Sequence, residues 1–164
     1  MILIAEDDSV IRRFCSRTLR EAGYDVLEAQ DGEAALRHIE THDTIELVIT
    51  DLTMPRFSGH EIAEVLSVFR PGVLVLGMSS SAHKLSPDRR LPVLAKPFSK
   101  STLLAAVREM RLRAAAAVPW AEEKRAHAQE LGRIAAALQL QSSSPPEKIN
   151  LVAIAVELQS SSAN

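Results

Sequence analysis

Two hydrophobic periodicities alternate along the first 113 residues of this chain. Short continuous apolar runs, typical of strands covered on both faces, occur at residues 1–5, 24–29, 45–50, 72–78 and 92–95. Segments with apolar residues at helical spacing lie at residues 9–22, 32–42, 59–69 and 99–113. Strands that alternate with helices favour parallel pairing and right-handed crossovers. The pattern therefore predicts an α/β fold with a five-stranded parallel sheet.

The character of the chain changes after residue 113. Pro119 suits the first turn of a new helix, and the weak apolar stripe that follows predicts a helix at about 119–140. Ser144 and Glu147 form a capping-box pattern before a second apolar segment, which predicts a helix at about 145–159, with a strand as the alternative. We therefore expect a domain at residues 1–113 and a helical extension at residues 114–164.

Composition and charge narrow the class of protein. The 19 basic side chains do not outnumber the 21 acidic ones, so the chain lacks the basic excess of a nucleic-acid binder. The apolar runs are too short to cross a bilayer, and no charged-then-apolar leader follows Met1, so we expect a cytoplasmic protein without membrane contact. The single cysteine, Cys15, excludes an internal disulfide and fits a buried position in an apolar helix.

Polar residues follow the ends of several predicted strands. In an open parallel sheet, ligands bind at the carboxyl ends of the strands, so these residues are expected to meet at one edge. They are Glu6, Asp7, Asp8, Asp51, Ser79, Ser80 and Lys96.

The acidic residues among them predict a divalent metal site. Carboxylates gathered at one place repel each other unless a cation or a proton intervenes. Oxygen ligands suit Mg²⁺, with Asp7 and Asp51 binding directly and Glu6 acting through water. The turn after Asp51 directs the backbone carbonyl of Thr53 toward the same ion. Asp8 is better explained as a cap on the first helix.

A magnesium ion, an ammonium and a hydroxyl around one carboxylate match the needs of phosphoryl transfer. The transferring group spreads negative charge over three oxygens, so catalysis is mainly positioning and charge neutralisation. Asp51 is then the nucleophile that forms an acyl phosphate. Ser79, favoured over Ser80 and Ser81, donates to one phosphoryl oxygen, and Lys96 pairs with another. The Lys96–Pro97 bond is a candidate cis peptide.

The motifs "ILIAEDD", "DLTMPRFSGHE" and "LAKPFS", in this order, resemble the receiver domain of two-component response regulators over residues 1–113. The resemblance implies a flavodoxin-like, doubly wound five-stranded sheet. It implies that Asp51 accepts phosphate from a histidine kinase or a histidine phosphotransfer protein, and that the chain signals through protein–protein contacts. No DNA-binding motif is evident in the extension, which is expected to pack on the receiver, pair two chains, or present its apolar stripe to another protein.

Two departures from the family pattern stand out. The interval between Ser79 and Lys96 holds two prolines and little helical periodicity, so the fourth helix of the family is expected to be degenerate, as in receivers of hybrid sensor kinases. Val93 occupies the place of the usual switch aromatic, so the coupling of phosphorylation to output is expected to differ.

Two other functions compete with this interpretation. A receiver-like adaptor would keep the acidic pocket without being phosphorylated, and the absent switch aromatic favours it. An aspartyl-phosphate hydrolase of the haloacid dehalogenase type needs a second aspartate two residues after the nucleophile. Residue 53 is threonine, which argues against the hydrolase.

Overall fold

The computed structural model describes residues 1–80, 91–116 and 151–152, and within them the predicted strands and helices appear in the predicted order. The elements are β1 (Ile2–Ala5), α1 (Ser9–Glu21), β2 (Val26–Ala29), α2 (Gly32–Thr41), β3 (Leu47–Asp51), α3 (Gly59–Phe69), β4 (Leu74–Ser79), β5 (Val93–Ala95) and α4 (Lys100–Ala116). The helices expected at 119–140 and 145–159, and the degenerate fourth helix expected within 81–90, lie outside the described residues, apart from the helical residues 151–152.

The five strands form one sheet, in the order β2-β1-β3-β4-β5, and every pairing is parallel. The order reverses between β1 and β3, which creates the crevice at the carboxyl ends where ligands bind in folds of this kind. The flavodoxin-like architecture expected from the resemblance is thereby confirmed.

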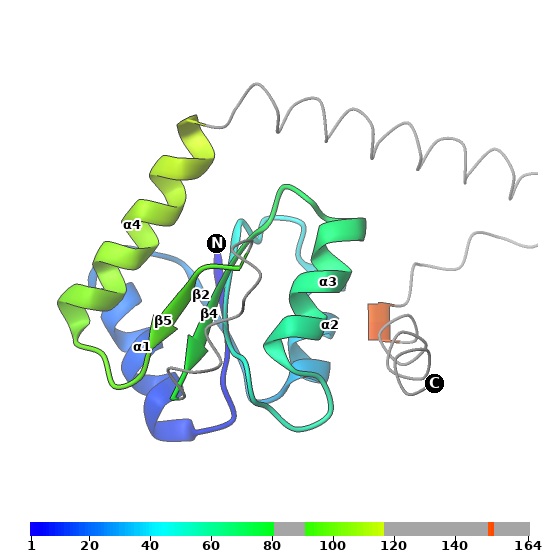
Figure 1. Cartoon of the computed structure of the whole chain (residues 1–164), viewed down its shortest axis with the longest axis horizontal. Helices are drawn as coiled ribbons and strands as arrows, with labels where there is room; N and C mark the ends of the chain where they lie inside the picture. Colours follow the sequence, from blue (N-terminus) through cyan, green and yellow to red (C-terminus); the bar gives the residue numbers. More distant parts are fainter. Residues whose placement is uncertain (81–90, 117–150, 153–164) are drawn as a thin grey trace, which may run out of the picture.

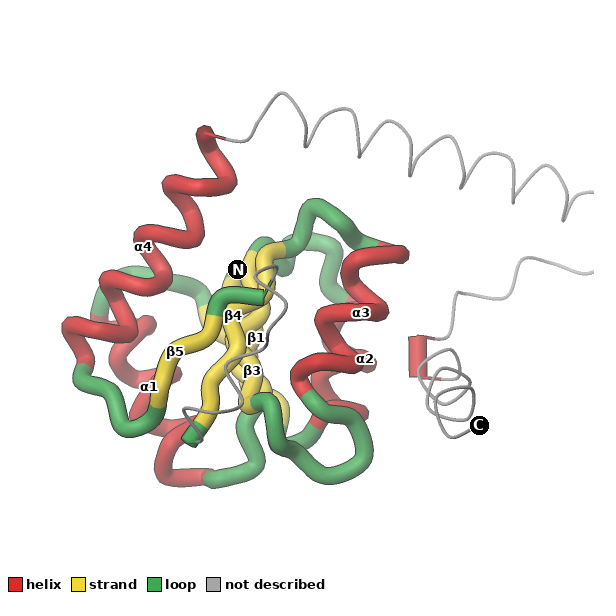
Figure 2. Tube along the Cα trace, in the orientation of Figure 1, coloured by secondary structure: helices red, strands yellow, loops and turns green. Residues whose placement is uncertain are grey.

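Helices cover the sheet on both faces, giving three layers (Figures 1 and 2). Alternate residues of β1 point to opposite faces: Leu3 belongs to the apolar cluster beneath α2 and α3, and Ile4 to the cluster beneath α1 and α4. Both residues are fully buried. This two-sided burial explains why the strands read as continuous apolar runs in the sequence.

Local signals set where the helices begin and end. The side chains of Asp8, Asp31 and Ser58 accept backbone N–H groups at the starts of α1, α2 and α3. Gly23, just after α1, adopts a positive φ of 86°, which a side-chain-bearing residue would resist. The final helix extends to Ala116 rather than ending near 113, because alanine, which favours helix most, continues the sequence.

Arg70 follows α3 and holds the end of α2. Its guanidinium donates to four backbone carbonyls, one in the last turn of α2 and three in the segment that follows, so one side chain satisfies acceptors at and just beyond the end of a helix. The carbonyls are those of Ile39, His42, Asp43 and Ile45.

No helix of the described residues is long and apolar enough to span a bilayer.

Candidate functional site

The site lies at the carboxyl edge of the sheet, where β1 and β3 end. Asp51 is the last residue of β3, and 13% of its side chain is exposed. Its Oδ2 lies 2.6 Å from Nζ of Lys96, and its Oδ1 accepts the N–H of Thr53 at 2.8 Å. The carboxylate is therefore held in one orientation and still reaches solvent.

Lys96 joins two carboxylates. Its Nζ donates to Oε2 of Glu6 and to Oδ2 of Asp51, each at 2.6 Å. The side chains of Glu6 and Lys96 are 1% and 8% exposed, so each charge needs the other as compensation for lost hydration. Burial alone would lower the pKa of Lys96, but the hydrogen bonds and charges of Asp51 and Glu6 outweigh it and raise that pKa. The ammonium form is thus fixed.

Glu6 is buried, and both of its carboxylate oxygens accept hydrogen bonds. Besides the bond from Lys96, it accepts the N–H of Asp8 through Oε1 at 3.4 Å. Burial raises the pKa of Glu6, the hydrogen bond and charge of Lys96 lower it, and the nearby Asp51 charge raises it, so that the pKa lies above its usual value. The role expected for Glu6, contact with an ion through water, stays a prediction; its observed contact is with Lys96.

Three carboxylates meet at this edge, as the sequence predicted. One oxygen from each of Glu6, Asp7 and Asp51 lies within 4.8 Å of the others, and Asp7 is the exposed member. A set of hard oxygen donors, partly open to solvent, fits Mg²⁺, which retains several waters when it binds. Thr53 lies beside the site through its N–H; the role predicted for its carbonyl stays a prediction.

Ser79 ends β4 and is 3% exposed, whereas the neighbouring Ser80 is exposed. Its carbonyl accepts the N–H of Lys96 at 2.7 Å, so the hydroxyl-bearing residue and the lysine are neighbours across two strands. This placement favours Ser79 over Ser80, while Ser81 lies outside the described residues. The peptide bond between Lys96 and Pro97 is cis, as anticipated.

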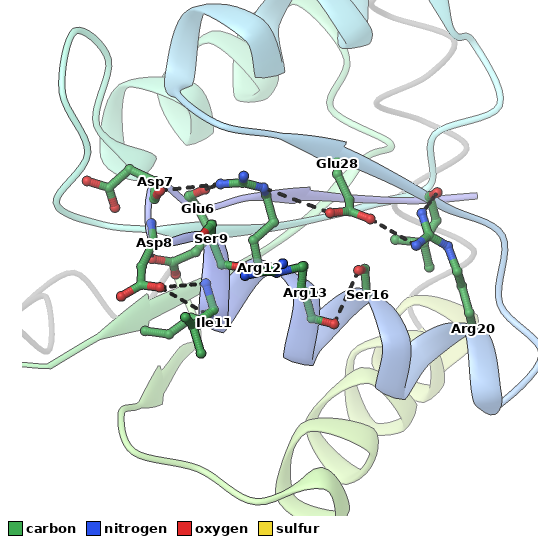
Figure 3. A network of polar contacts seen from close by, with 12 residues as sticks. Glu6, Asp7, Asp8, Ser9, Ile11, Arg12, Arg13, Ser16, Arg20 and Glu28 are labelled. Carbon is green, nitrogen blue, oxygen red and sulfur yellow. Dashed lines mark hydrogen bonds and ion pairs between the residues drawn. The ribbon is translucent and has the colours of Figure 1, made fainter.

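Asp8 is a helix cap, as predicted. Its Oδ1 accepts the N–H groups of Val10 at 2.7 Å and Ile11 at 3.2 Å (Figure 3). These two bonds lower the pKa of the Asp8 carboxyl. The Asp8 carboxylate is thereby directed to the start of α1, and Asp7 is the acid of the pair that joins the carboxylate group at the site.

Sequence reasoning missed Arg12, which holds the backbone beneath the acidic residues. Its Nη1 donates to the carbonyls of Glu6 at 2.6 Å and Asp7 at 3.3 Å (Figure 3). Its Nε lies 3.8 Å from Glu28 of β2, which also pairs with Arg20. An arginine one turn into the helix after "EDD" was the available signal for the two carbonyl contacts, whereas the contact with Glu28 depends on β2 being adjacent.

The loop after Asp51 is fixed to α2. Gly32 begins α2 against this loop, and a Cβ there would overlap the Phe57 carbonyl oxygen. Arg56, which has a positive φ of 69°, pairs with Glu33. Ser58, which directly follows Phe57, forms a reciprocal capping box with Glu61. The end of the loop that leads from Asp51 into α3 is therefore held in place.

Comparison with known proteins agrees with this geometry. A family model described as the response regulator receiver domain matches residues 2–108. The response regulator receiver protein CpdR of Brucella abortus (strain 2308) is 32% identical over 118 residues, which cover 69% of this chain and 98% of CpdR. The chain spans about half the length of several other curated relatives that it matches.

Solved structures give the same result. The receiver domain of the hybrid histidine kinase CckA superposes with a TM-score of 0.58 at 33% identity, over 66% of this chain and 96% of that one. The response regulator TrrA from Thermotoga maritima, solved in complex with Mg²⁺ and BeF, gives a TM-score of 0.61 at 27% identity, over 66% and 96% of the two chains.

Proposed function

The chain belongs to the response regulator receiver family, a family of signalling domains rather than classical enzymes, and from this we propose that Asp51 is its phosphoacceptor. The observation that carries the proposal is that the Lys96 ammonium donates to both Glu6 and Asp51, at the edge where the acidic residues gather. The donor is a phosphohistidine on a histidine kinase or a histidine phosphotransfer protein.

The transfer step follows from the groups at the site. A carboxylate oxygen of Asp51 attacks the phosphorus atom, the O–P bond forms, and the N–P bond to the donor imidazole breaks. The leaving nitrogen keeps the bonding electron pair and the phosphoryl group remains on Asp51 as an acyl phosphate. Lys96 pairs with one phosphoryl oxygen and the Ser79 hydroxyl donates to another, so charge on the transferring group is met by fixed donors.

We further propose that Mg²⁺ is the cofactor of this site. Asp7 and Asp51 would bind it directly, Glu6 through water, and Thr53 through its backbone carbonyl. When bound, the ion supplies positive charge that offsets the repulsion between the carboxylates and the incoming phosphoryl group. The oxygen donor set supports this choice, as does the Mg²⁺ complex of the relative TrrA.

Output is through protein–protein contact. The balance of 19 basic and 21 acidic residues does not favour nucleic acid as a partner. Val93, which stands at the start of β5, offers no aromatic ring to swing toward the phosphate. The change that follows phosphorylation therefore reaches its partner by other side chains at this edge.

Intact mass after incubation with Mg²⁺ and acetyl phosphate tests the proposal. The parent should gain one phosphoryl group and Asp51→Asn none. Asp43→Asn, an exposed carboxylate in the loop before β3, is the matched control and should behave as the parent. If the parent gains nothing from acetyl phosphate or from phosphorylated histidine kinases, the proposal is wrong and the adaptor function replaces it.

A further inference from the structure

Residues 151–152 pack against the receiver, although they are distant from it along the sequence. Leu151 is only 4% exposed, and it belongs to the apolar cluster that includes Leu36 and Ile39 of α2. Val152 packs against the same cluster. In Figure 1 this short orange segment is on the side of the molecule that carries α2 and α3.

A polar contact accompanies this burial. The carboxylate of Glu40, on α2, accepts the backbone N–H of Leu151 through Oε1. The same oxygen accepts the N–H of Val152 at 3.3 Å. Hydrogen bonds to an ionised acceptor are stronger than those between neutral groups, so Glu40 fixes two consecutive amides.

The two contacts constrain the segment in different ways. Burial of Leu151 is non-directional, and any apolar side chain of suitable size would be stabilised at this position. The Glu40 bonds are directional and require two adjacent amides that point at one oxygen. Together they specify both where the segment lies and which way its backbone faces.

We infer that α2 is an intramolecular docking site, and that its occupant is the segment of this chain containing Leu151 and Val152. This proposal is independent of phosphorylation at Asp51. The chain leaves the receiver through α4, whose Leu103 and Val107 pack in the cluster on the opposite face of the sheet. The segment at Leu151 and Val152 therefore packs on the face of the sheet opposite to the one that α4 covers.

Hydrogen exchange on the full chain tests the docking. In the parent, the amides of Leu151 and Val152 should exchange at least about tenfold more slowly than in an unstructured peptide of the same sequence. Glu40→Ala should accelerate their exchange about tenfold or more, and Glu40→Gln, which retains a neutral acceptor, should have a smaller effect. Leu151→Ala should release the Val152 amide as well.

Glu64→Ala provides the matched control, because Glu64 is an exposed carboxylate on the neighbouring helix α3. Its exchange pattern should equal that of the parent. Unprotected amides in the parent, or equal protection in Glu40→Ala and the parent, would overturn the proposal. Protection that disappears on dilution as a dimer dissociates would also overturn it, because the segment would then belong to a second copy.

Discussion

Nζ of Lys96 lies 2.6 Å from Oδ2 of Asp51, although 45 positions separate the two residues in the sequence. The same nitrogen lies 2.6 Å from Oε2 of the buried Glu6. One ammonium therefore links the end of β3 to the residue after β1. It neutralises charge at the site before any phosphoryl group arrives.

Replacement of this lysine should impair both chemistry and folding. Lys96→Met keeps the apolar stem and removes the charge, so the transferring group loses a fixed donor, and the rate of phosphorylation by acetyl phosphate should fall about 100-fold. The buried Glu6 also loses its partner, which should lower the free energy of unfolding in urea by about 3 kcal/mol. Lys100→Met, at an exposed ion pair with Glu21, is the control and should change neither quantity appreciably. Phosphorylation of Lys96→Met at the parental rate would refute the role of the lysine.

Arg12 should affect metal affinity without touching the ion. Arg12→Ala removes the donor that holds the carbonyls of Glu6 and Asp7, so the adjacent carboxylates lose their fixed positions. Residues that support metal ligands typically contribute about 10-fold or more to affinity, and we expect Mg²⁺ to bind about 10-fold more weakly by titration calorimetry. Arg13→Ala is the control, because Arg13 donates to Ser9 within α1. Equal Mg²⁺ affinity in Arg12→Ala and the parent would show that the backbone at Glu6 and Asp7 keeps its shape without Arg12.

Much of the fold follows from the sequence because its signals are local. The helix predicted at residues 59–69 has those bounds in the structure, since Gly59 follows a capping serine and an apolar stripe begins at once. The second strand, expected from Tyr24, begins at Val26 instead. Tyr24 and Asp25 follow the turn at Gly23, and pairing with β1 starts only at Val26. Strand ends thus depend on the partner strand, which the local pattern does not contain.

The candidate site, like the fold, was predicted from the sequence only in part. Glu6, Asp7 and Asp51 were predicted to meet because each follows a strand, and the parallel topology brings them to one edge. The contacts of Arg70, and that of Arg12 with Glu28, were missed because long side chains reach groups that only the assembled fold places nearby. The tail contact at Glu40 was missed for the same reason: an exposed glutamate on a helix usually has only solvent as its partner.

Arg70 should contribute strongly to stability. Arg70→Ala leaves four backbone carbonyls without their donor, and three of the four lost hydrogen bonds are partly buried. We expect the free energy of unfolding in urea to fall by about 2 to 3 kcal/mol. Arg17→Ala, which removes an exposed pair with Glu21, should cost about 0.5 kcal/mol or less. Similar losses in the two variants would mean that the carbonyls are satisfied by water.

Cys15 should be inert in the folded protein. Burial, assisted by the charge of Glu6, raises the pKa of its thiol to about 12 from 9.0, and the residue is 0% exposed. A disulfide reagent at pH 8 should therefore label the protein only after unfolding, because it reacts with the thiolate.

The same shift has a consequence for stability at high pH. The folded state holds the proton more tightly than the unfolded state, so the contribution of Cys15 is complete below pH 9 and is lost as the pH rises toward 12. Cys15→Ala should show a weaker decline of unfolding free energy between pH 9 and 11 than the parent. Identical declines would show that other groups dominate this range.

The pairing of β5 with β4 rests on three residue pairs, Gly77 with Val93, Met78 with Leu94, and Ser79 with Ala95. Successive side chains along a strand alternate between faces, and this count of residues decides where Lys96 emerges. Deleting one residue between Val93 and the lysine would turn the ammonium toward the opposite layer and leave every reacting group present in the sequence. The reactivity of Asp51 thus depends on the number of residues in β5. A chain that keeps all its motifs but has one residue fewer there would fold and would not be phosphorylated.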